Sequence, residues 1–346
     1  MERKIALVLG ATGGIGGAVA RLMEQRGWQV RALHRDPDSV VAKHGFDWRK
    51  GDAMVASDVA TAAEGVSLIV HAVNPPGYRN WGKLVLPMID NSIAAARASG
   101  ARILLPGTVY NYGPDAFPDI AEDSPQHPQT RKGAIRVEME RRLRSFAESG
   151  AGTVLIVRAG DFFGAAAAST WFSQIVPAGK RPTAITYPGR RGVGHQWAYL
   201  PDVADTMVRL IEADGLDAFA TFHMQGVWDA DGTRMIEALC RVLGDPAVAV
   251  RRTPWWMMRL VSPFVPTLRE VMEMRYLWEQ PVRLSNDRLT AKLGTEPHTP
   301  LDIAVRETLM AMGCLDAAPV VRPREAVPSY VVPVPLPIHA TSVVTQ

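Results

Sequence analysis

Short, mostly apolar runs alternate along the first half of the chain with segments in which apolar residues recur every three or four positions. A continuous apolar run is typical of a strand buried on both faces, and the longer period is typical of an amphipathic helix. The alternation predicts an α/β fold, a doubly wound parallel sheet with helices on both faces. We expect strands at 5–9, 29–33, around Trp48, and at 67–71, 102–105 and 153–157, with the clearest helices at 84–99 and 131–148.

The pattern changes after residue 160, where aromatic residues and prolines become frequent. A strand near 196–199, a helix at 202–211 and a strand near 219–223 indicate a return to the main sheet. The tail is so rich in Pro and Val that neither a helix nor a central strand can form there. We therefore expect a main domain (1–160 plus 196–225), a smaller discontinuous lobe (161–195 plus 226–315) and an extended tail (316–346).

Three glycines, Gly10, Gly13 and Gly16, follow the first predicted strand at once and open the first predicted helix. Positions without side chains let the backbone approach a pyrophosphate, and a helix N-terminus offers N–H groups and the positive end of its dipole. The order of strand, glycine turn and helix predicts a dinucleotide-binding site of the Rossmann type. The residues expected to bind are Gly10, Thr12, Gly13, Gly14, Ile15 and Gly16.

The Gly-x-x-Gly-x-x-Gly spacing resembles that of the extended and atypical short-chain dehydrogenase/reductases, the superfamily of the NAD-dependent epimerases and dehydratases. The segments 157–164, 196–204 and 281–301 resemble later landmarks of the same superfamily, so that the likeness covers about residues 4–310. Within the second segment, Asp202 is expected to cap a helix. The resemblance implies an NAD(P)-dependent oxidoreductase whose smaller lobe binds the substrate.

The residues after the second and third strands bear on the choice of cofactor. Arg35, assisted by His34, is placed to pair with a 2′-phosphate, which favours NADP over NAD, although Arg35 as a solvated loop charge is the alternative. Asp52 resembles the residue that accepts from the adenine amino group, and capping the following helix is its alternative role. After the fourth strand, the expected lining of the nicotinamide ribose and phosphates is Ala72, Val73 and Asn74.

The catalytic residues depart from the superfamily pattern. Thr108 matches the usual Ser/Thr position, but the usual Tyr-x-x-x-Lys pair is replaced by Lys132 and Arg136. A Lys-x-x-x-Arg pair resembles the isoflavone reductase-like branch, which implies that Lys132 is the acid/base. Arg136, on the same helix face, is then expected to hold the cofactor. Tyr110, and after it Tyr112, is the next candidate for the proton donor.

A solvent-facing basic helix start in a protein that binds nucleotide without turnover is the alternative to this assignment. Thr130 is expected to cap the helix and so to place Lys132 in its first turn, where the helix dipole and burial disfavour a positive charge. Either role depends on which way this helix start faces.

Composition excludes several classes of protein. Net charge is only +3 over 346 residues, which argues against nucleic-acid binding, and no apolar run is long enough for stable membrane insertion. Two cysteines, Cys240 and Cys314, are too few for a disulfide framework and lack metal-site spacing, so that no metal is expected and the compartment is expected to be cytoplasmic. The sequence leaves open whether the chain forms a homodimer.

These observations favour an NADP-dependent oxidoreductase that transfers hydride to a carbonyl or activated double bond of a small, hydrophobic substrate. Two alternatives remain. One is an NAD-dependent sugar-nucleotide-type epimerase or dehydratase, against which the missing tyrosine–lysine pair counts. The other is an NmrA-like regulator that binds a dinucleotide without catalysis.

Overall fold

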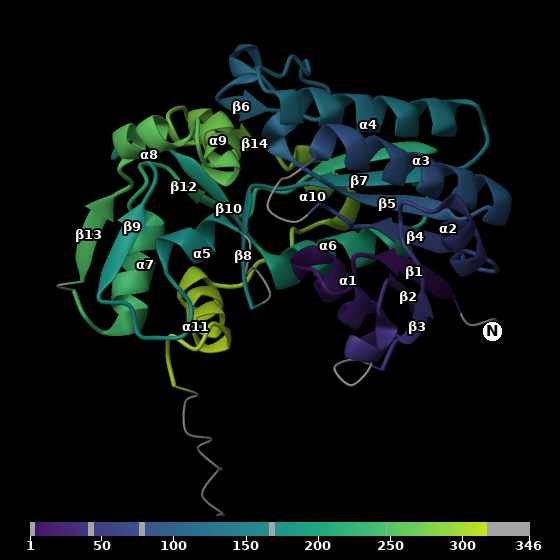
Figure 1. Ribbon diagram of the computed structural model, residues 1–346, viewed down its shortest axis with the longest axis horizontal. Helices are drawn as coiled ribbons and strands as arrows, with labels where there is room; N and C mark the ends of the chain where they lie inside the picture. Colours follow the sequence, from purple (N-terminus) through teal and green to yellow (C-terminus); the bar gives the residue numbers. More distant parts are fainter. Residues whose placement is uncertain (1–3, 41–44, 76–79, 166–169, 247, 317–346) are drawn as a thin grey trace, which may run out of the picture. The chain divides into compact units, whose positions relative to one another are not determined.

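A seven-stranded, fully parallel sheet, on the right in Figure 1, is the largest sheet of the described residues. The computed structural model describes residues 4–40, 45–75, 80–165, 170–246 and 248–316. The tail predicted at 316–346 lies outside them except for its first residue. The strand order is β11-β7-β5-β4-β1-β2-β3, with β1 (Ile5–Leu9), β2 (Gln29–His34), β3 (Asp47–Lys50), β4 (Leu68–His71), β5 (Arg102–Gly107), β7 (Val154–Arg158) and β11 (Phe219–His223).

Helices cover both faces of this sheet, as the sequence pattern predicts. Successive side chains of a strand point to opposite faces. Accordingly, Val8 packs with α1 and α6, whereas Leu7 and Leu9 pack with the helices of the other face. One layer therefore holds α1 (Gly14–Gln25) and α6 (Leu200–Glu212), and the other holds α2 (Ala56–Ala62), α3 (Trp81–Ser99) and α4 (Arg131–Glu148). The doubly wound α/β fold is confirmed.

The helix α4 begins and ends where the sequence predicts. Thr130 is its N-cap, and the Thr130 side chain accepts a hydrogen bond from the backbone N–H of Gly133 at 3.0 Å. Lys132 therefore lies in the first turn, as expected. The expected cap at Asp202 is wrong, because α6 is capped by Tyr199. Asp202 lies in the first turn instead and accepts hydrogen bonds from the backbone N–H and hydroxyl of Thr299.

The strand predicted near 196–199 is present but pairs outside the main sheet. It is β10 (His195–Tyr199), which lies between β8 (Asp161–Phe163) and β12 (Val227–Asp229) in a three-stranded sheet. The chain leaves the main sheet directly after β7, and Gly160 packs so tightly there that a Cβ would overlap the carbonyl oxygen of Gln196. The later helix α6 and strand β11 do return to the main sheet.

Most of the remaining elements lie after residue 160, in the part of the chain rich in aromatics. Two further two-stranded sheets pair β9 (Ala184–Tyr187) with β13 (Ala249–Arg252), and β6 (Asp119–Ile120) with β14 (Arg283–Leu284). The helices are α5 (Trp171–Ile175), α7 (Arg234–Leu243), α8 (Trp255–Val261), α9 (Pro266–Glu273), α10 (Asp287–Leu293) and α11 (Leu301–Ala311). Short 3-10 helices occur at Pro37–Ser39, Val109–Asn111, Pro114–Ala116 and Arg275–Trp278.

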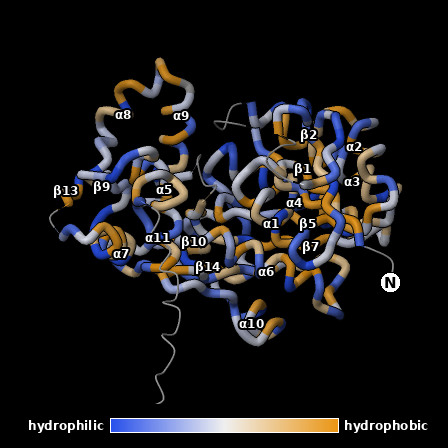
Figure 2. Tube along the Cα trace, turned by 90° about the horizontal axis from the view of Figure 1, so that it is seen from below, coloured by the Kyte–Doolittle hydropathy of each residue, from blue (hydrophilic) through white to orange (hydrophobic). Residues whose placement is uncertain are grey.

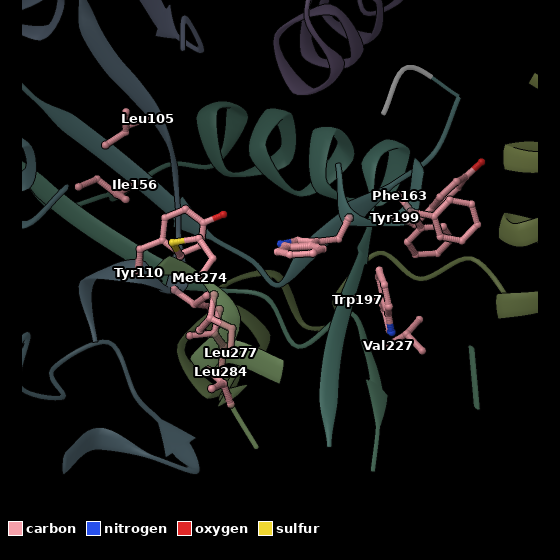
Figure 3. Close-up of a cluster of buried hydrophobic side chains, with 14 of the residues drawn as sticks. Leu105, Tyr110, Ile156, Phe163, Trp197, Tyr199, Val227, Met274, Leu277 and Leu284 are labelled. Atoms are coloured by element: carbon pink, nitrogen blue, oxygen red, sulfur yellow. The ribbon is translucent and has the colours of Figure 1, made fainter. Parts of the chain in front are cut away.

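One hydrophobic cluster runs without a break from the main sheet into the segments predicted to form the smaller lobe. Leu105 and Ile156 of the main sheet belong to the same buried cluster as Trp197 and Leu277 of the lobe (Figure 3). Four tryptophans are buried within it: Trp81, Trp171, Trp197 and Trp278. A continuous apolar core fixes the lobe against the carboxyl ends of the parallel strands, where ligands bind in folds of this class.

Candidate functional site

The glycine turn after β1 has the geometry that a pyrophosphate site requires. Gly10 has a φ of +93°, and a Cβ there would lie 2.6 Å from the carbonyl oxygen of Ala72. At Gly16 a Cβ would overlap the carbonyl oxygen of Gly10. Gly13 closes the turn, its N–H donating to the Gly10 carbonyl at 2.9 Å. Only glycine fits at positions 10 and 16, because backbone packs directly on backbone there.

The start of α1 is suited to an anion. The residue at its N-cap position is Gly13, which has no side chain to bond the backbone N–H groups of the first turn. The first turn also contains no acidic residue. Thr12 and Gly13 are exposed, while Gly14 and Ile15 are half-buried. Backbone N–H groups at an uncapped helix start, together with the helix dipole, favour a phosphate. The predicted binding residues of this turn therefore come together in one cradle that fits a dinucleotide.

The end of β4 connects the glycine turn with α4. His71 is buried, and its Nδ1 lies 2.8 Å from the hydroxyl of Ser92. Burial, followed by the nearby charge of Arg136, lowers the pKa of His71 to about 3. The Arg136 guanidinium lies 5.1 Å from the ring centre of Trp81. Ala72, which packs on the glycine turn, is the next residue after His71. Ala72 and Arg136, both predicted to contact the cofactor, therefore lie at the same edge of the sheet.

The other predicted cofactor residues are accessible at the same edge. After β4, Val73 is half-buried and Asn74 is exposed. After β2, Arg35 is exposed and His34 is held by its own loop, with Nδ1 accepting from the backbone N–H of Asp36 at 3.1 Å.

Asp52 stabilises the turn that precedes α2. Its Oδ1 accepts from the backbone N–H of Met54 at 3.0 Å, before the start of α2. The N-cap of α2 is Val55, so the alternative that Asp52 caps that helix is wrong.

The loop after β5 and the first turn of α4 pack closely on each other. Thr108 caps the 3-10 helix Val109–Asn111, its hydroxyl oxygen accepting from the Tyr110 N–H at 3.3 Å. Tyr110 is buried. A Cβ on Gly133 would overlap the Tyr110 carbonyl oxygen, so glycine lets α4 start against this loop. Thr108, Tyr110 and Lys132 are thus brought to one place.

Lys132 is buried and held by two carboxylates of α9. Its side chain is 2% exposed, and Nζ forms ion pairs with Glu270 and with Glu273, the latter at 2.5 Å. The backbone N–H of Lys132 also donates to Glu273 Oε1 at 3.1 Å. Arg136 is only 9% exposed. The alternative of a solvent-facing basic helix start is therefore wrong.

Tyr112 belongs to a buried polar network behind this site. Its hydroxyl lies 3.1 Å from Nε2 of His223, which is also 2.9 Å from Nη1 of Arg158. Arg158 in turn pairs with Glu140, Nε to Oε1 being 3.1 Å. Burial raises the pKa of Tyr112 to about 12. A hydroxyl engaged in this way supports the packing of α4 on β7 and β11 and is a poor proton donor to a substrate.

The smaller lobe supplies polar groups that the sequence pattern does not single out. His195 stacks on Trp278 with ring centres 3.7 Å apart, and its Nε2 lies 2.9 Å from Asp161 Oδ2. Within the described residues, the buried hydroxyls of Tyr187 and Tyr276 have no hydrogen-bond partner. Burial raises the pKa of Tyr276, and the nearby charges of Glu273 and Asp161 raise it further. Tyr276 therefore lies near both the Lys132 cluster and the His195–Asp161 pair.

Comparison with known proteins fits this geometry. The family model described as the NAD dependent epimerase/dehydratase family matches residues 6–220. The chain belongs to this family. The match spans the glycine turn, the Thr108 loop and α4, so the superfamily resemblance is confirmed. No curated protein matches the sequence.

Several solved structures have the same fold. UDP-glucuronic acid 4-epimerase from Bacillus cereus in complex with NAD is 13% identical, with a TM-score of 0.70 over 89% of this chain and 98% of that one. MoeE5 in complex with UDP-glucose and NAD is 16% identical, with a TM-score of 0.69 over 89% and 98%. A nucleoside-diphosphate-sugar epimerase from Pseudomonas aeruginosa is 17% identical, with a TM-score of 0.66 over 89% and 97%. At these identities the likeness shows the fold.

Two further findings concern other kinds of site. No helix in the described part of the chain is long and apolar enough to cross a membrane. Among the same residues, His, Cys, Asp and Glu form no group that could hold a metal ion.

Proposed function

We propose that this family member is a nicotinamide-dinucleotide-dependent enzyme that acts on a small substrate carrying a hydroxyl, a carbonyl or an activated double bond. The observation that carries the proposal is the position of Lys132. This lysine lies in the first turn of α4, against the Thr108 loop, one helical turn from Arg136 and at the sheet edge that carries the glycine turn. A titratable cation beside a dinucleotide cradle is suited to proton transfer.

The residues that would hold the cofactor fit its parts. The backbone of the turn from Gly10 to Gly16 would bind the pyrophosphate, Asp52 the adenine, and Arg136 the nicotinamide ribose. Residues 72–74 would line the path between pyrophosphate and nicotinamide. When bound, the cofactor supplies or accepts the hydride.

Arg35 makes NADP the favoured cofactor in this proposal. It is exposed directly after β2, where the adenosine ribose binds in this fold, and its guanidinium matches a 2′-phosphate in shape and charge. The family description and the NAD-bound neighbours favour NAD. Arg35 is the residue at which the two cofactors would be distinguished.

Lys132 would move the proton from its Nζ. In the reducing direction Nζ donates to the substrate oxygen as negative charge develops there. In the oxidising direction Nζ first passes its extra proton to Glu270 or Glu273, and the neutral amine then takes the hydroxyl proton. The carboxylates of Glu270 and Glu273 hold Nζ when no substrate is bound. Their side chains are 31% and 23% exposed, so they can turn toward solvent when a substrate oxygen replaces one of them.

A sugar-nucleotide-type epimerase or dehydratase is the second candidate, favoured by the family match and by the epimerase neighbours. In that reaction the hydride leaves the substrate and returns to it, so the cofactor is not consumed. Lys132 would take the proton of the hydroxyl group on the carbon that loses the hydride. The chain differs from the usual superfamily pattern at this position, where lysine stands in place of tyrosine.

One paired assay separates these functions. Purified protein is mixed with NADPH or NADH and a panel of aromatic and aliphatic carbonyls and enones, and the absorbance of the reduced cofactor is followed. In parallel, UDP-sugars are incubated with catalytic NAD, and the products are resolved by chromatography. Stoichiometric loss of reduced cofactor supports the reductase, and a converted sugar without net cofactor change supports the epimerase. Tight cofactor binding without turnover in either assay would favour the non-catalytic regulator.

A further inference from the structure

Helix α8 and the turn that joins it to α9 expose a set of large apolar side chains. Phe264 is 84% exposed, Trp256 70% and Leu260 66%. We call this set the hairpin patch, and it consists of Trp256, Met257, Leu260, Val261, Phe264 and Val265. In Figure 2 the turn between α8 and α9 stands out from the rest of the trace and is coloured as hydrophobic. Water-exposed apolar surface of this kind usually marks an interaction site.

The hairpin patch is firmly connected to the body of the protein behind it. The indole N–H of Trp255 donates to the carbonyl oxygen of Pro188 at 2.9 Å, and its ring packs on Trp171. At the far end of the hairpin, Glu270 and Glu273 hold Lys132. The exposed side chains are therefore displayed by a fixed element and do not belong to the core.

Arginines flank the hairpin patch along the chain. Arg251 and Arg252 precede it, Arg259 lies within it and Arg269 follows it, and all four side chains are exposed. The sequence from 246 to 269 contains no Asp or Glu. The first acidic residues after it, Glu270 and Glu273, are paired with Lys132. The surroundings therefore complement a negatively charged partner.

We propose that the hairpin patch docks on the surface of an anionic lipid bilayer. Tryptophan and phenylalanine favour the boundary between headgroups and acyl chains, and leucine and valine bury beneath it. Arginines around such an apolar tip pair with lipid phosphates. Apolar residues alone would suit many partners, but the four arginines in a segment with no Asp or Glu from 246 to 269 favour an anionic surface.

Charge also makes a second copy of the chain the weaker occupant. In a two-fold symmetric contact the same patch faces itself, so the arginine rims would lie opposite each other. The segment 246–269 offers no carboxylate to neutralise them. An anionic bilayer supplies phosphates at every position around the rim.

The test is sedimentation of the full-length protein with lipid vesicles at low salt. We expect binding to vesicles of phosphatidylcholine and phosphatidylglycerol in a two-to-one ratio, weak binding to phosphatidylcholine alone, and a loss of binding as salt screens the charges. The double variant Leu260→Ser, Phe264→Ser should bind roughly tenfold less, because it removes the apolar anchor. The variant Arg251→Glu, Arg252→Glu should lose binding to the anionic vesicles.

Two substitutions on α11 are matched controls. Ile303 is 50% exposed and Arg306 is exposed, so Ile303→Ser and Arg306→Glu change the same kinds of side chain away from the hairpin. They should sediment like the wild type. Failure of the wild type to bind anionic vesicles, or equal binding by the hairpin variants, would overturn the proposal. So would a lipid-free wild-type dimer, seen by light scattering, that the Leu260/Phe264 variant converts to monomer, because a second copy would then be the occupant.

Discussion

Lys132 at the start of α4 and Glu273 at the end of α9 are joined twice, Nζ to Oε2 at 2.5 Å and backbone N–H to Oε1 at 3.1 Å. The two residues are 141 positions apart. The contact ties α9 to the lysine that is proposed to move the proton. Substrate access to Lys132 and the position of α9 are therefore linked in the proposed reaction.

Lys132→Met should lower turnover by roughly 10²–10⁴, the usual contribution of a general acid or base. Cofactor affinity should stay near that of the wild type, because Lys132 is proposed to face the substrate oxygen. Arg136→Met is the contrasting variant and should raise the cofactor dissociation constant. Cofactor titration by fluorescence and single-turnover hydride transfer measure the two effects separately. A full single-turnover rate in Lys132→Met would transfer the role to Tyr110.

The two glutamates should matter for stability because they balance a buried charge. The double variant Glu270→Gln, Glu273→Gln leaves an ammonium group that is 2% exposed without either carboxylate. We expect a loss of about 2–3 kcal/mol in the free energy of unfolding, less than for fully buried partners because both carboxylates are partly exposed. Adding Lys132→Met should recover most of this loss. Urea denaturation of the three proteins measures it, and equal stability of the double and triple variants would contradict the explanation.

Gly13→Val should abolish dinucleotide binding while leaving the fold intact. Gly13 is exposed, and a Cβ there would lie 3.2 Å from the Gly10 carbonyl oxygen, a contact that a small shift relieves. The added side chain would nevertheless occupy the approach of the pyrophosphate. Gly45→Val is the control, because Gly45 is an exposed glycine outside the turn with its nearest atom 3.7 Å from the added Cβ. Calorimetric titration measures the dinucleotide affinity, and thermal unfolding measures whether the fold is intact. Unchanged affinity in folded Gly13→Val would show that the glycine turn does not bind the pyrophosphate.

Arg35→Ala should weaken NADPH binding by about 1.5–3 kcal/mol and leave NADH binding nearly unchanged. The reason is the loss of a charge-assisted pair with the 2′-phosphate, which NADH lacks. Arg306→Ala, on α11, is the matched removal of an exposed arginine elsewhere. Equal losses for both cofactors would show that Arg35 does not recognise the 2′-phosphate.

The sequence predicts the parts of this structure that depend on local pattern. The parallel strands, the glycine turn and both ends of α4 follow from apolar periodicity, glycine spacing and the Thr130 cap. The sheet to which β10 belongs does not follow from the sequence, because an apolar strand pattern does not show which sheet the strand joins. The partners of Lys132 could not be found either. Glu270 and Glu273 share a helix face at a spacing of three, but nothing local connects that face with α4.

Acid sensitivity should arise in part from His71. Burial lowers its pKa to about 3, whereas in the unfolded chain it titrates near 6.5. Between these values the unfolded state binds a proton that the native state does not, so stability falls as the pH falls from 6.5 toward 3. The contribution is at most about 1.4 kcal/mol per pH unit. His223, whose pKa burial also lowers to about 3, acts in the same direction.

The variant His71→Asn should therefore flatten the fall in the free energy of unfolding between pH 6.5 and 5 without abolishing it, because His223 remains. Ser92→Ala is the control for packing, since it removes the hydroxyl that lies 2.8 Å from His71 Nδ1 but keeps the titratable ring. We expect Ser92→Ala to lower stability at every pH and to keep the acid slope of the wild type. Urea denaturation of both variants at a series of pH values provides the measurement. An unchanged slope in His71→Asn would mean that other groups cause the acid sensitivity.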